Sequence, residues 1–460
     1  MPYDHISFPP GFLWGCATSA HQVEGNNENN DWWAFERVPG AIWRDDRSGL
    51  ACDWWRNAEA DFDRMVELNH NTHRLSIEWS RVERQEDVWD ERAVARYREM
   101  LSGLCQRGIE PMVTLHHFST PLWLARQGGW SNPAVVAHFR RWAARAWDYF
   151  GDLVNLWCTI NEPSVYAALG HLYGQHAPGA RGLRNFCLVL RNMLKAHAAA
   201  YRVIHSLDGQ AQVGLVKHVR IFDPADPSAP LDRFGAWFLD YAFNQIPLKA
   251  VQDGKLRPPV GLGLSPHGPL IDSSDFIGLN YYSRDMVAFE PGQGEFLGLR
   301  LFARPGAEVS DHGRHGTYGE IYPEGMYRSL MRVARLGRPI YVAEMGLPDA
   351  DDEQRPRFLI THLAQVARAI NDGADVRGLY HWSLTDNFEW AEGWALRFGL
   401  IAMDEKTQAR TVRPSGRLFA AIAAENALTR DMVRAYAPEV MEMIQLAPPK
   451  IGRDIRQRGI

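Results

Sequence analysis

The sequence predicts an α/β protein built as a single (β/α)8 TIM barrel with elaborated βα loops. About eight short apolar runs recur along the chain, and longer segments with helical periodicity lie between most of them. Strands that alternate with helices form a parallel sheet through right-handed crossovers, and about eight such units are enough to close it. Many of the apolar runs also end in polar or aromatic residues, which is typical of a barrel with a polar mouth.

The candidate strands are short and almost continuously apolar, as expected for strands that are covered on both faces. They span residues 12–19, 72–79, 110–117, 153–162, 211–219, 274–281, 339–346 and 376–384. The candidate helices between them span 53–68, 91–107, 133–150, 185–207, 322–336 and 352–372.

Two regions do not follow this alternation. Residues 283–319 form a long, irregular, glycine-bearing insertion after the sixth strand, on the side where active-site loops of such barrels lie. The tail after residue 430 carries several prolines and is not needed to close the barrel. We therefore expect a catalytic barrel at 1–430 and a C-terminal extension at 431–460, packed on the barrel or partly disordered.

Composition narrows the classes of function. Hydrophobic residues make up 46% of the chain and charged residues 23%, as in a folded protein with a large core. The net charge is only −5, which offers no broad basic surface, so neither nucleic acid nor a membrane is an expected partner. The amino terminus lacks the pattern of a signal peptide, and the five cysteines form no close pairs, so we expect a cytoplasmic protein.

Catalytic residues in such barrels gather at the carboxyl ends of the strands. Two glutamates, Glu162 and Glu344, follow the fourth and seventh candidate strands, and other strand ends carry amides, imidazoles and indoles. Paired carboxyl groups suit glycoside hydrolysis, in which one attacks the anomeric carbon and the other protonates the leaving oxygen. A separation of roughly 5–5.5 Å would indicate retention of configuration.

Several motifs occur in an order that resembles the family 1 glycoside hydrolases, the β-glucosidase and β-galactosidase family. They are FPPGFLWGCATSAHQVEG, TINEP, GLNYY, EIYPEG and WSLTDNFEWAEGWALRFGL, and the resemblance extends to RPSGRLFAAIA. It covers most of the chain. It implies a single (β/α)8 barrel and a retaining mechanism on β-linked sugars, without a metal or an organic cofactor.

The resemblance also implies roles for individual residues. Glu162 matches the general acid/base and Glu344 the nucleophile, while Asn161 matches the amide that holds the sugar 2-hydroxyl. Arg74 and Tyr282 match the groups that bond to the nucleophile and keep it ionised. The residues that match contacts to the sugar ring and its hydroxyl groups are Gln22, His117, Asn280, Trp382, Glu389, Trp390 and Phe398.

These roles require different proton states from two identical side chains. A neighbouring cation such as Arg74 is expected to lower the pKa of Glu344, whereas burial and the nearby negative charge are expected to keep Glu162 protonated. Glu389 stands where family branches that act on 6-phosphorylated sugars have a serine, and a carboxylate there repels phosphate, which favours unphosphorylated sugars.

The chain departs from the family pattern at three positions. Ala343 and Met345 flank the predicted nucleophile where the family has polar residues, and Phe118 replaces a tryptophan after His117. Because both glutamates are present, we expect altered tuning of the site and not loss of the reaction. Weaker binding of the sugar is the expected effect of Phe118.

The predicted function is a retaining β-glycosidase that releases terminal β-glucosyl residues from small β-glycosides and short oligosaccharides, with β-galactosides and β-fucosides as secondary substrates. Two alternatives stay open: a non-catalytic sugar-binding barrel and a metal-dependent barrel hydrolase. The second alternative is disfavoured because the adjacent His116 and His117 would point to opposite faces of a strand. The aglycone, the glucose or galactose preference and the formation of a homo-oligomer stay undetermined.

Overall fold

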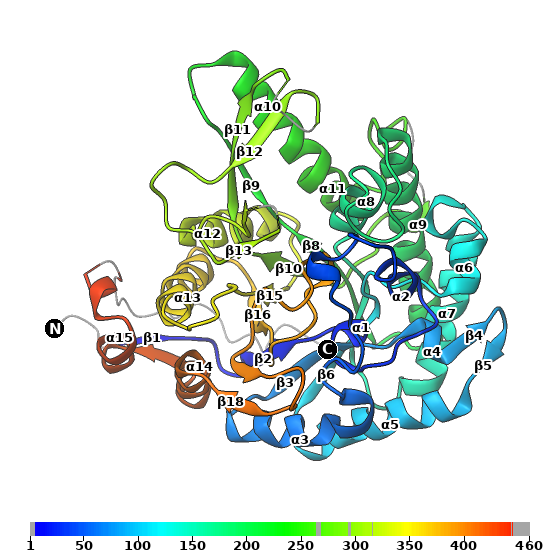
Figure 1. Ribbon diagram of the computed structural model, residues 1–460, viewed down its shortest axis with the longest axis horizontal. Helices are drawn as coiled ribbons and strands as arrows, with labels where there is room; N and C mark the ends of the chain where they lie inside the picture. The colour runs from blue at the N-terminus through cyan, green and yellow to red at the C-terminus, as the bar shows by residue number, and fades with distance from the viewer. Residues whose placement is uncertain (1–4, 264–267, 293–295, 315, 443, 445–460) are drawn as a thin grey trace.

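A computed structural model describes residues 5–263, 268–292, 296–314, 316–442 and 444. At its centre eight parallel strands form a closed barrel, surrounded by helices (Figure 1). Around the barrel the strands follow the order β10-β15-β16-β2-β3-β6-β7-β8. The predicted fold class is confirmed.

Each barrel strand lies inside one of the ranges predicted from the sequence. The bounds are β2 Leu13–Ala17, β3 Thr72–Ser76, β6 Glu110–His116, β7 Leu156–Asn161, β8 Gln212–His218, β10 Phe276–Tyr281, β15 Ile340–Met345 and β16 Val376–Trp382. Their side chains are almost all buried, because the barrel interior covers one face and the helices cover the other. This double coverage explains the nearly continuous apolar runs.

The outer layer contains the predicted helices. Their bounds are α3 Trp54–Glu67, α5 Glu91–Gln106, α7 Val135–Phe150, α9 Leu183–Leu207, α12 Pro323–Ala334 and α13 Arg355–Asn371. Helix α5 shows how the sequence determines where such a helix begins and ends. The Asp90 carboxylate accepts hydrogen bonds from the backbone N–H groups of Arg92 and Ala93 at the start, and Gly108, with φ of 72°, follows the end.

Two hydrophobic clusters organise this core. The larger one lies between strands and helices, and the smaller one lies inside the barrel and extends up to its mouth. The inner cluster includes Met112, Cys158, Val216, Ala343 and Tyr380. The barrel is therefore packed through its length, which leaves the mouth as the place for a site.

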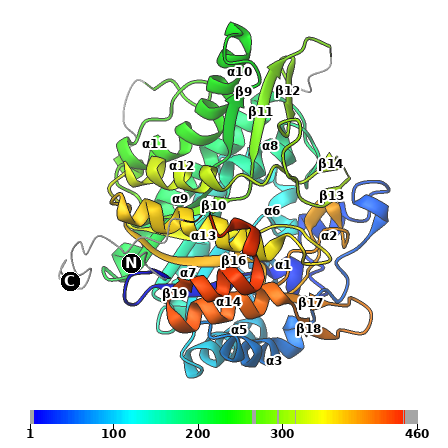
Figure 2. The ribbon, with the colours of Figure 1, turned by 90° about the vertical axis from the view of Figure 1, so that its left-hand side faces the viewer.

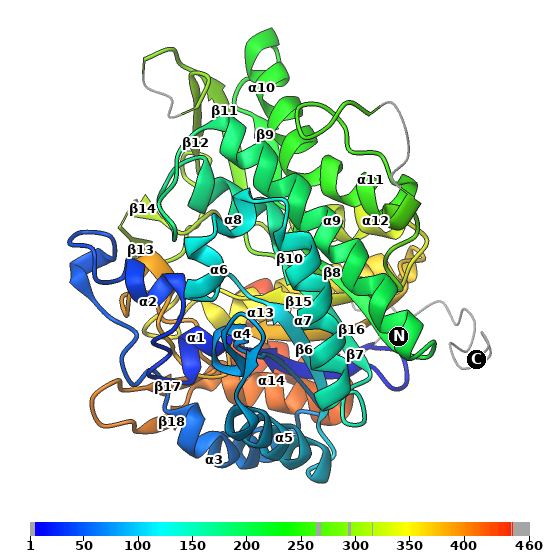
Figure 3. The same cartoon turned by 90° about the vertical axis from the view of Figure 1, so that its right-hand side faces the viewer.

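A lobe projects from the barrel at the mouth (Figures 2 and 3). It contains β9 Ile221–Pro224, helix α10 Pro230–Asp240, β11 Arg284–Phe289 and β12 Leu299–Phe302, with β11 paired to both other strands. Ala236, Val287 and Leu299 form its own small apolar core. The expectation of an irregular segment at 283–319 is corrected here, because its first part forms β11 and β12 of the lobe.

A segment before the first barrel strand and a segment after the last one meet at one pair of strands. Strand β1 His5–Ser7 runs antiparallel to β19 Ala427–Thr429, and the adjoining α15 Arg430–Tyr436 buries Met432 and Val433. Helix α15 contacts α13 and α14 Pro414–Glu425, so this beginning of the predicted extension packs on the barrel. Positions 443 and 445–460 of the predicted extension lie outside the described residues. Across the part of the chain that the structure describes, no helix is both long and apolar enough to cross a membrane.

Candidate active site

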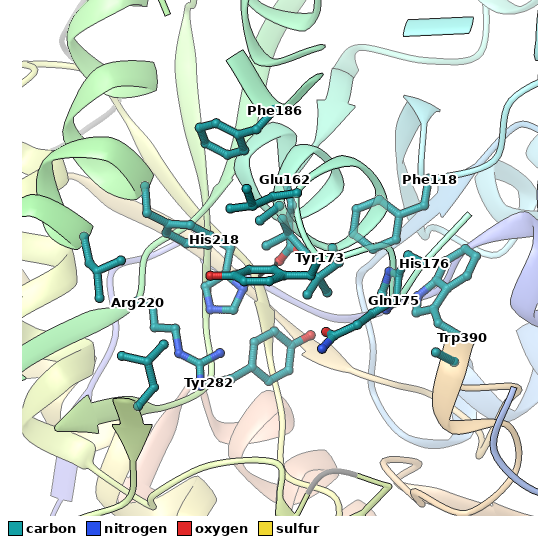
Figure 4. Close-up of a pocket in the computed structure, with 18 of the residues that line it drawn as sticks. Phe118, Glu162, Tyr173, Gln175, His176, Phe186, His218, Arg220, Tyr282 and Trp390 are labelled. Atoms are coloured by element: carbon teal, nitrogen blue, oxygen red, sulfur yellow. Dashed lines mark ion pairs between the residues drawn. The ribbon is translucent and has the colours of Figure 1, made fainter. Parts of the chain in front are cut away.

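A cavity of about 380 Å³ opens at the carboxyl ends of the barrel strands. It brings together most of the residues singled out in the sequence. Figure 4 shows Glu162, Tyr282 and Trp390 among the residues around it. Those that line it are His117, Asn161, Glu162, Tyr282, Glu344, Trp382, Glu389 and Trp390. Both predicted glutamates therefore face one cavity, from the ends of different strands.

Glu344, near the end of β15, is held by two donors. Arg74 Nη1 donates to Oε1 at 2.5 Å, and the Tyr282 hydroxyl donates to Oε2 at 2.7 Å. Arg74 lies on β3 and is itself fixed by bonds to Thr114 Oγ1 at 3.1 Å and Asn161 Oδ1 at 2.7 Å. Burial raises the pKa of Glu344 to about 7, although Arg74 and Tyr282 act in the opposite direction.

Glu162 directly follows β7 and has a different set of partners. Asn280 Nδ2 donates to Oε1 at 2.8 Å, and His218 Nδ1 lies 3.3 Å from the same oxygen. Burial alone would raise the pKa of Glu162, but His218, Asn280 and then Lys217 hold it below its usual value. Burial lowers the pKa of Lys217 to about 7.

The two pKa shifts run opposite to the expectation from the sequence. That expectation considered Arg74 beside Glu344 but not the bases beside Glu162. The attraction of His218 for Glu162 requires a charged imidazole, whereas burial lowers the pKa of His218. Once His218 is neutral, the negative charge of Glu344 favours a proton on Glu162. The proton state of Glu162 is thus linked to that of His218.

The side of the cavity around Glu389 is rich in buried polar groups. Gln22 Nε2 and Trp382 Nε1 donate to Oε2 of Glu389 at 3.2 and 3.3 Å. Burial raises the pKa of Glu389 to about 8. His117 also lines the cavity, and because burial depresses the pKa of its imidazole it is neutral there. Its Nε2 lies 3.2 Å from Asn161 Nδ2.

Aromatic rings enclose the same side. The His117 and Trp382 rings stack with centroids 5.6 Å apart, and Phe118 packs against Trp390 at 5.2 Å. Trp79, at the end of the predicted strand 72–79, does not line the cavity and stacks on Trp142 in the core, with ring centroids 5.9 Å apart. Helix α4 Trp79–Val82 begins at this residue and turns its indole towards the surrounding helices. A position at the end of a predicted strand does not indicate such a turn.

Four predicted site residues lie behind the cavity wall instead of on it. They are Gln22, Arg74, Asn280 and Phe398. The first three bond to Glu389, Glu344 and Glu162 respectively. Phe398 packs against the rings of Tyr282 and Tyr318 and does not line the cavity. The structure therefore gives no support to a direct contact between Phe398 and substrate.

The departures from the family pattern fall in different places. Ala343 is part of the cluster inside the barrel, and Met345 is part of the outer core, so neither lines the cavity. Phe118 does line it, with a backbone φ of 72°. Glu162 and Trp390 also have positive φ, at 48° and 50°. Such conformations cost energy for residues with a side chain, and here all three occur at the cavity.

Among the cavity residues that received no role from the sequence are His218, His176 and Tyr318. His218 lies at the end of the predicted strand 211–219, so it is one of the imidazoles that the sequence places at strand ends. Tyr318 belongs to the segment 283–319, which also contributes Phe296 and Leu301 to the lining. The expectation that this segment lies on the active-site side agrees with that placement.

A metal-dependent hydrolase was an alternative that the adjacent His116 and His117 disfavoured. The two imidazoles diverge, because His116 packs between Trp130 and Tyr166 while His117 faces the cavity. Among the described residues, no group of three or more His, Cys, Asp or Glu side chains has an arrangement that could hold a metal ion.

Comparison with known proteins adds independent information. A sequence model of glycosyl hydrolase family 1 matches residues 4–428. The β-glucosidase A of Thermotoga maritima is 32% identical over 448 residues, which cover 92% of this chain and 98% of that protein. The β-galactosidase of Pyrococcus woesei is 30% identical over 92% of this chain and 98% of its own.

Solved structures agree with these sequence matches. A β-glycosidase from Pyrococcus horikoshii superposes with a TM-score of 0.84 at 37% identity, covering 95% of this chain and 98% of that one. The Thermotoga maritima β-glucosidase in complex with deoxynojirimycin gives a TM-score of 0.83 at 31% identity, covering 92% and 99%. On the strength of the matched sequence, the barrel and the relatives, this chain belongs to glycosyl hydrolase family 1.

Proposed function

We propose that this enzyme is a retaining β-glycosidase that releases a terminal β-glucosyl residue from small β-glycosides, with β-galactosides and β-fucosides as further substrates. One observation carries the proposal: Glu162 and Glu344 line one cavity, and each has its own set of bonded partners. The relatives named as β-glucosidase and β-galactosidase support the choice of sugars.

In the first step the Glu344 carboxylate attacks the anomeric carbon while Glu162 protonates the departing oxygen. The products are a covalent glycosyl-enzyme and the free aglycone alcohol. Arg74 and Tyr282 stabilise the carboxylate form of Glu344 until it reacts. In the second step Glu162, now a carboxylate, removes a proton from water, which attacks the anomeric carbon and releases Glu344.

The polar side of the cavity would hold the sugar. Asn161 lies within 3.2 Å of both His117 and Asn280, which positions its amide for the hydroxyl next to the anomeric carbon. Glu389 would bind hydroxyl groups farther along the ring, and Trp382 would lie under it. We assign the catalytic unit to residues 1–430 and place the enzyme in the cytoplasm, in keeping with five free cysteines.

The decisive test removes the nucleophile. Glu344→Ala is expected to lower kcat on nitrophenyl β-glucoside by roughly four to six orders of magnitude. Azide should restore turnover and give an α-glycosyl azide, since the small anion can attack from the vacated side. A Glu344→Ala enzyme that keeps the activity of the parent would refute the assignment. Glu308→Ala, at an exposed glutamate that does not line the cavity, serves as the control.

A further inference from the structure

The cavity continues beyond Glu162 along a wall of different chemistry. Leu169 and Leu172 come from α8 Pro163–His171 and its end, Phe222 from β9, Leu239 from α10, and Phe243 from the π-helical turn Tyr241–Gln245. All five are only half-buried. Apolar side chains that face open space in this way gain free energy when an apolar group covers them.

The cation on this wall, Arg220, is already paired. The Arg220 guanidinium makes a paired contact with the Asp285 carboxylate, with Nη2 donating at 2.9 Å. Burial lowers the pKa of His176 to about 3, so its ring carries no charge at neutral pH. A second sugar would bring several hydroxyl groups out of water, and each would need a partner that leucine and phenylalanine side chains do not provide.

The apolar wall also extends outward. The ring of Phe238, which lines the cavity, stacks on Phe234 with centroids 6.2 Å apart. Phe234 and its neighbour Trp237 are more than half exposed, at 59% and 54%. In Figure 4, Phe186 and Arg220 lie on one side of Glu162, and Phe118 and Trp390 lie on the other. The apolar surface therefore leads from the first side of the cavity to the exterior along α10.

We propose that this site selects β-glycosides whose aglycone is an extended apolar group, held against α8, β9, α10 and the π-helical turn, in preference to those whose aglycone is a second sugar. This inference rests on the proposed function, because it assigns the leaving-group side of the same cavity. A linear alkyl chain is the simplest probe of it.

The experiment compares methyl, butyl, hexyl and octyl β-D-glucoside with cellobiose, all below the concentration at which micelles form. A methylene group that leaves water contributes about 0.8 kcal/mol, so kcat/KM should rise by roughly two- to four-fold for each added methylene. Octyl glucoside should exceed cellobiose by at least about ten-fold. A flat series, or cellobiose above octyl glucoside, overturns the inference.

Variants locate the effect. Leu239→Asn and, separately, Leu172→Asn should lower the ratio of kcat/KM for octyl to methyl glucoside by about ten-fold, since each places an amide on the apolar wall. The matched control is Leu207→Asn, at the exposed end of α9 and roughly 30 Å along that helix from Phe186. It should leave the ratio unchanged.

Two failures can be told apart. If no β-glycoside in the series, including a nitrophenyl glucoside, is cleaved, the proposed function itself fails. If nitrophenyl and methyl glucosides are cleaved but the ratio does not respond to Leu239→Asn and Leu172→Asn, only the apolar site is wrong. Because the two substitutions lie on separate elements, the test can still be made if one of the two variants does not fold.

Discussion

The cavity has two halves that differ in origin, burial and chemistry. The half around Glu389 and Glu344 is formed at the ends of barrel strands, and its polar groups are buried and bonded to one another. The half beyond Glu162 is formed by α8, the π-helical turn and the lobe, and most of its side chains are apolar and half-exposed. Glu162 lies between them.

The difference suggests a division of labour. Groups fixed on a closed barrel keep their geometry, which acid–base and nucleophilic steps require. Groups on connecting segments can change without disturbing that geometry, so they are suited to selecting the leaving group. Substitutions in the polar half should therefore affect all substrates alike, whereas substitutions in the apolar half should change the ranking of aglycones.

The largest effect that sharpens this comparison is expected at the boundary. Glu162→Ala removes the proton donor and should lower kcat/KM on alkyl glucosides by roughly 10²- to 10⁴-fold. Dinitrophenyl glucoside, whose leaving group needs no proton, should lose far less in the first step, and a burst of dinitrophenol should appear. Equal losses on both substrates would mean that Glu162 does not protonate the leaving group.

A smaller effect is expected from Tyr282→Phe in the polar half. This change deletes the donor to Glu344 Oε2, a charge-assisted bond worth about 1.5–3 kcal/mol, so kcat/KM should fall by roughly 10- to 100-fold. Tyr282 acts to lower the pKa of Glu344, so the acidic limb of the pH profile should move to higher pH. The fall should be similar for methyl and octyl glucoside. A fall in kcat/KM for octyl glucoside alone would contradict the proposed division between the two halves of the cavity.

The smallest effect concerns His218→Asn. Removing a base that lowers the pKa of Glu162 should raise that pKa, so the alkaline limb of kcat/KM, where the acid loses its proton, should move to higher pH. The charged or titratable neighbours Lys217, Arg220, Tyr282 and Glu344 stay in place. An unchanged alkaline limb would show that His218 has only a packing role.

The barrel could be predicted well because its signal is repeated. Strands covered on both faces must be apolar throughout, and helices that cover them must be amphipathic, so the eight predicted strands and six predicted helices indicated the same fold. The ends of the strands then indicated which polar residues share the mouth. Glu162 and Glu344, far apart in sequence, line one cavity for this reason.

Other features left no comparable signal. Strands β11 and β12 are short and pair within a small lobe that has its own core. Glycines near these strands made the segment look irregular in the sequence. Trp79 and Trp382 both follow or end strands, yet only local turns decide which indole faces the cavity. The proton states also escaped prediction, because they depend on Lys217 and His218 meeting Glu162 in three dimensions.

The left-handed backbone at Glu162 has a consequence for heat resistance. A residue with a side chain at φ of 48° costs of order 1–3 kcal/mol relative to relaxed backbone, and glycine would remove that cost. A Glu162→Gly protein, which lacks the proton donor, should therefore melt at a higher temperature than the parent enzyme. At residue 162, catalytic activity favours glutamate, whereas thermal stability favours glycine.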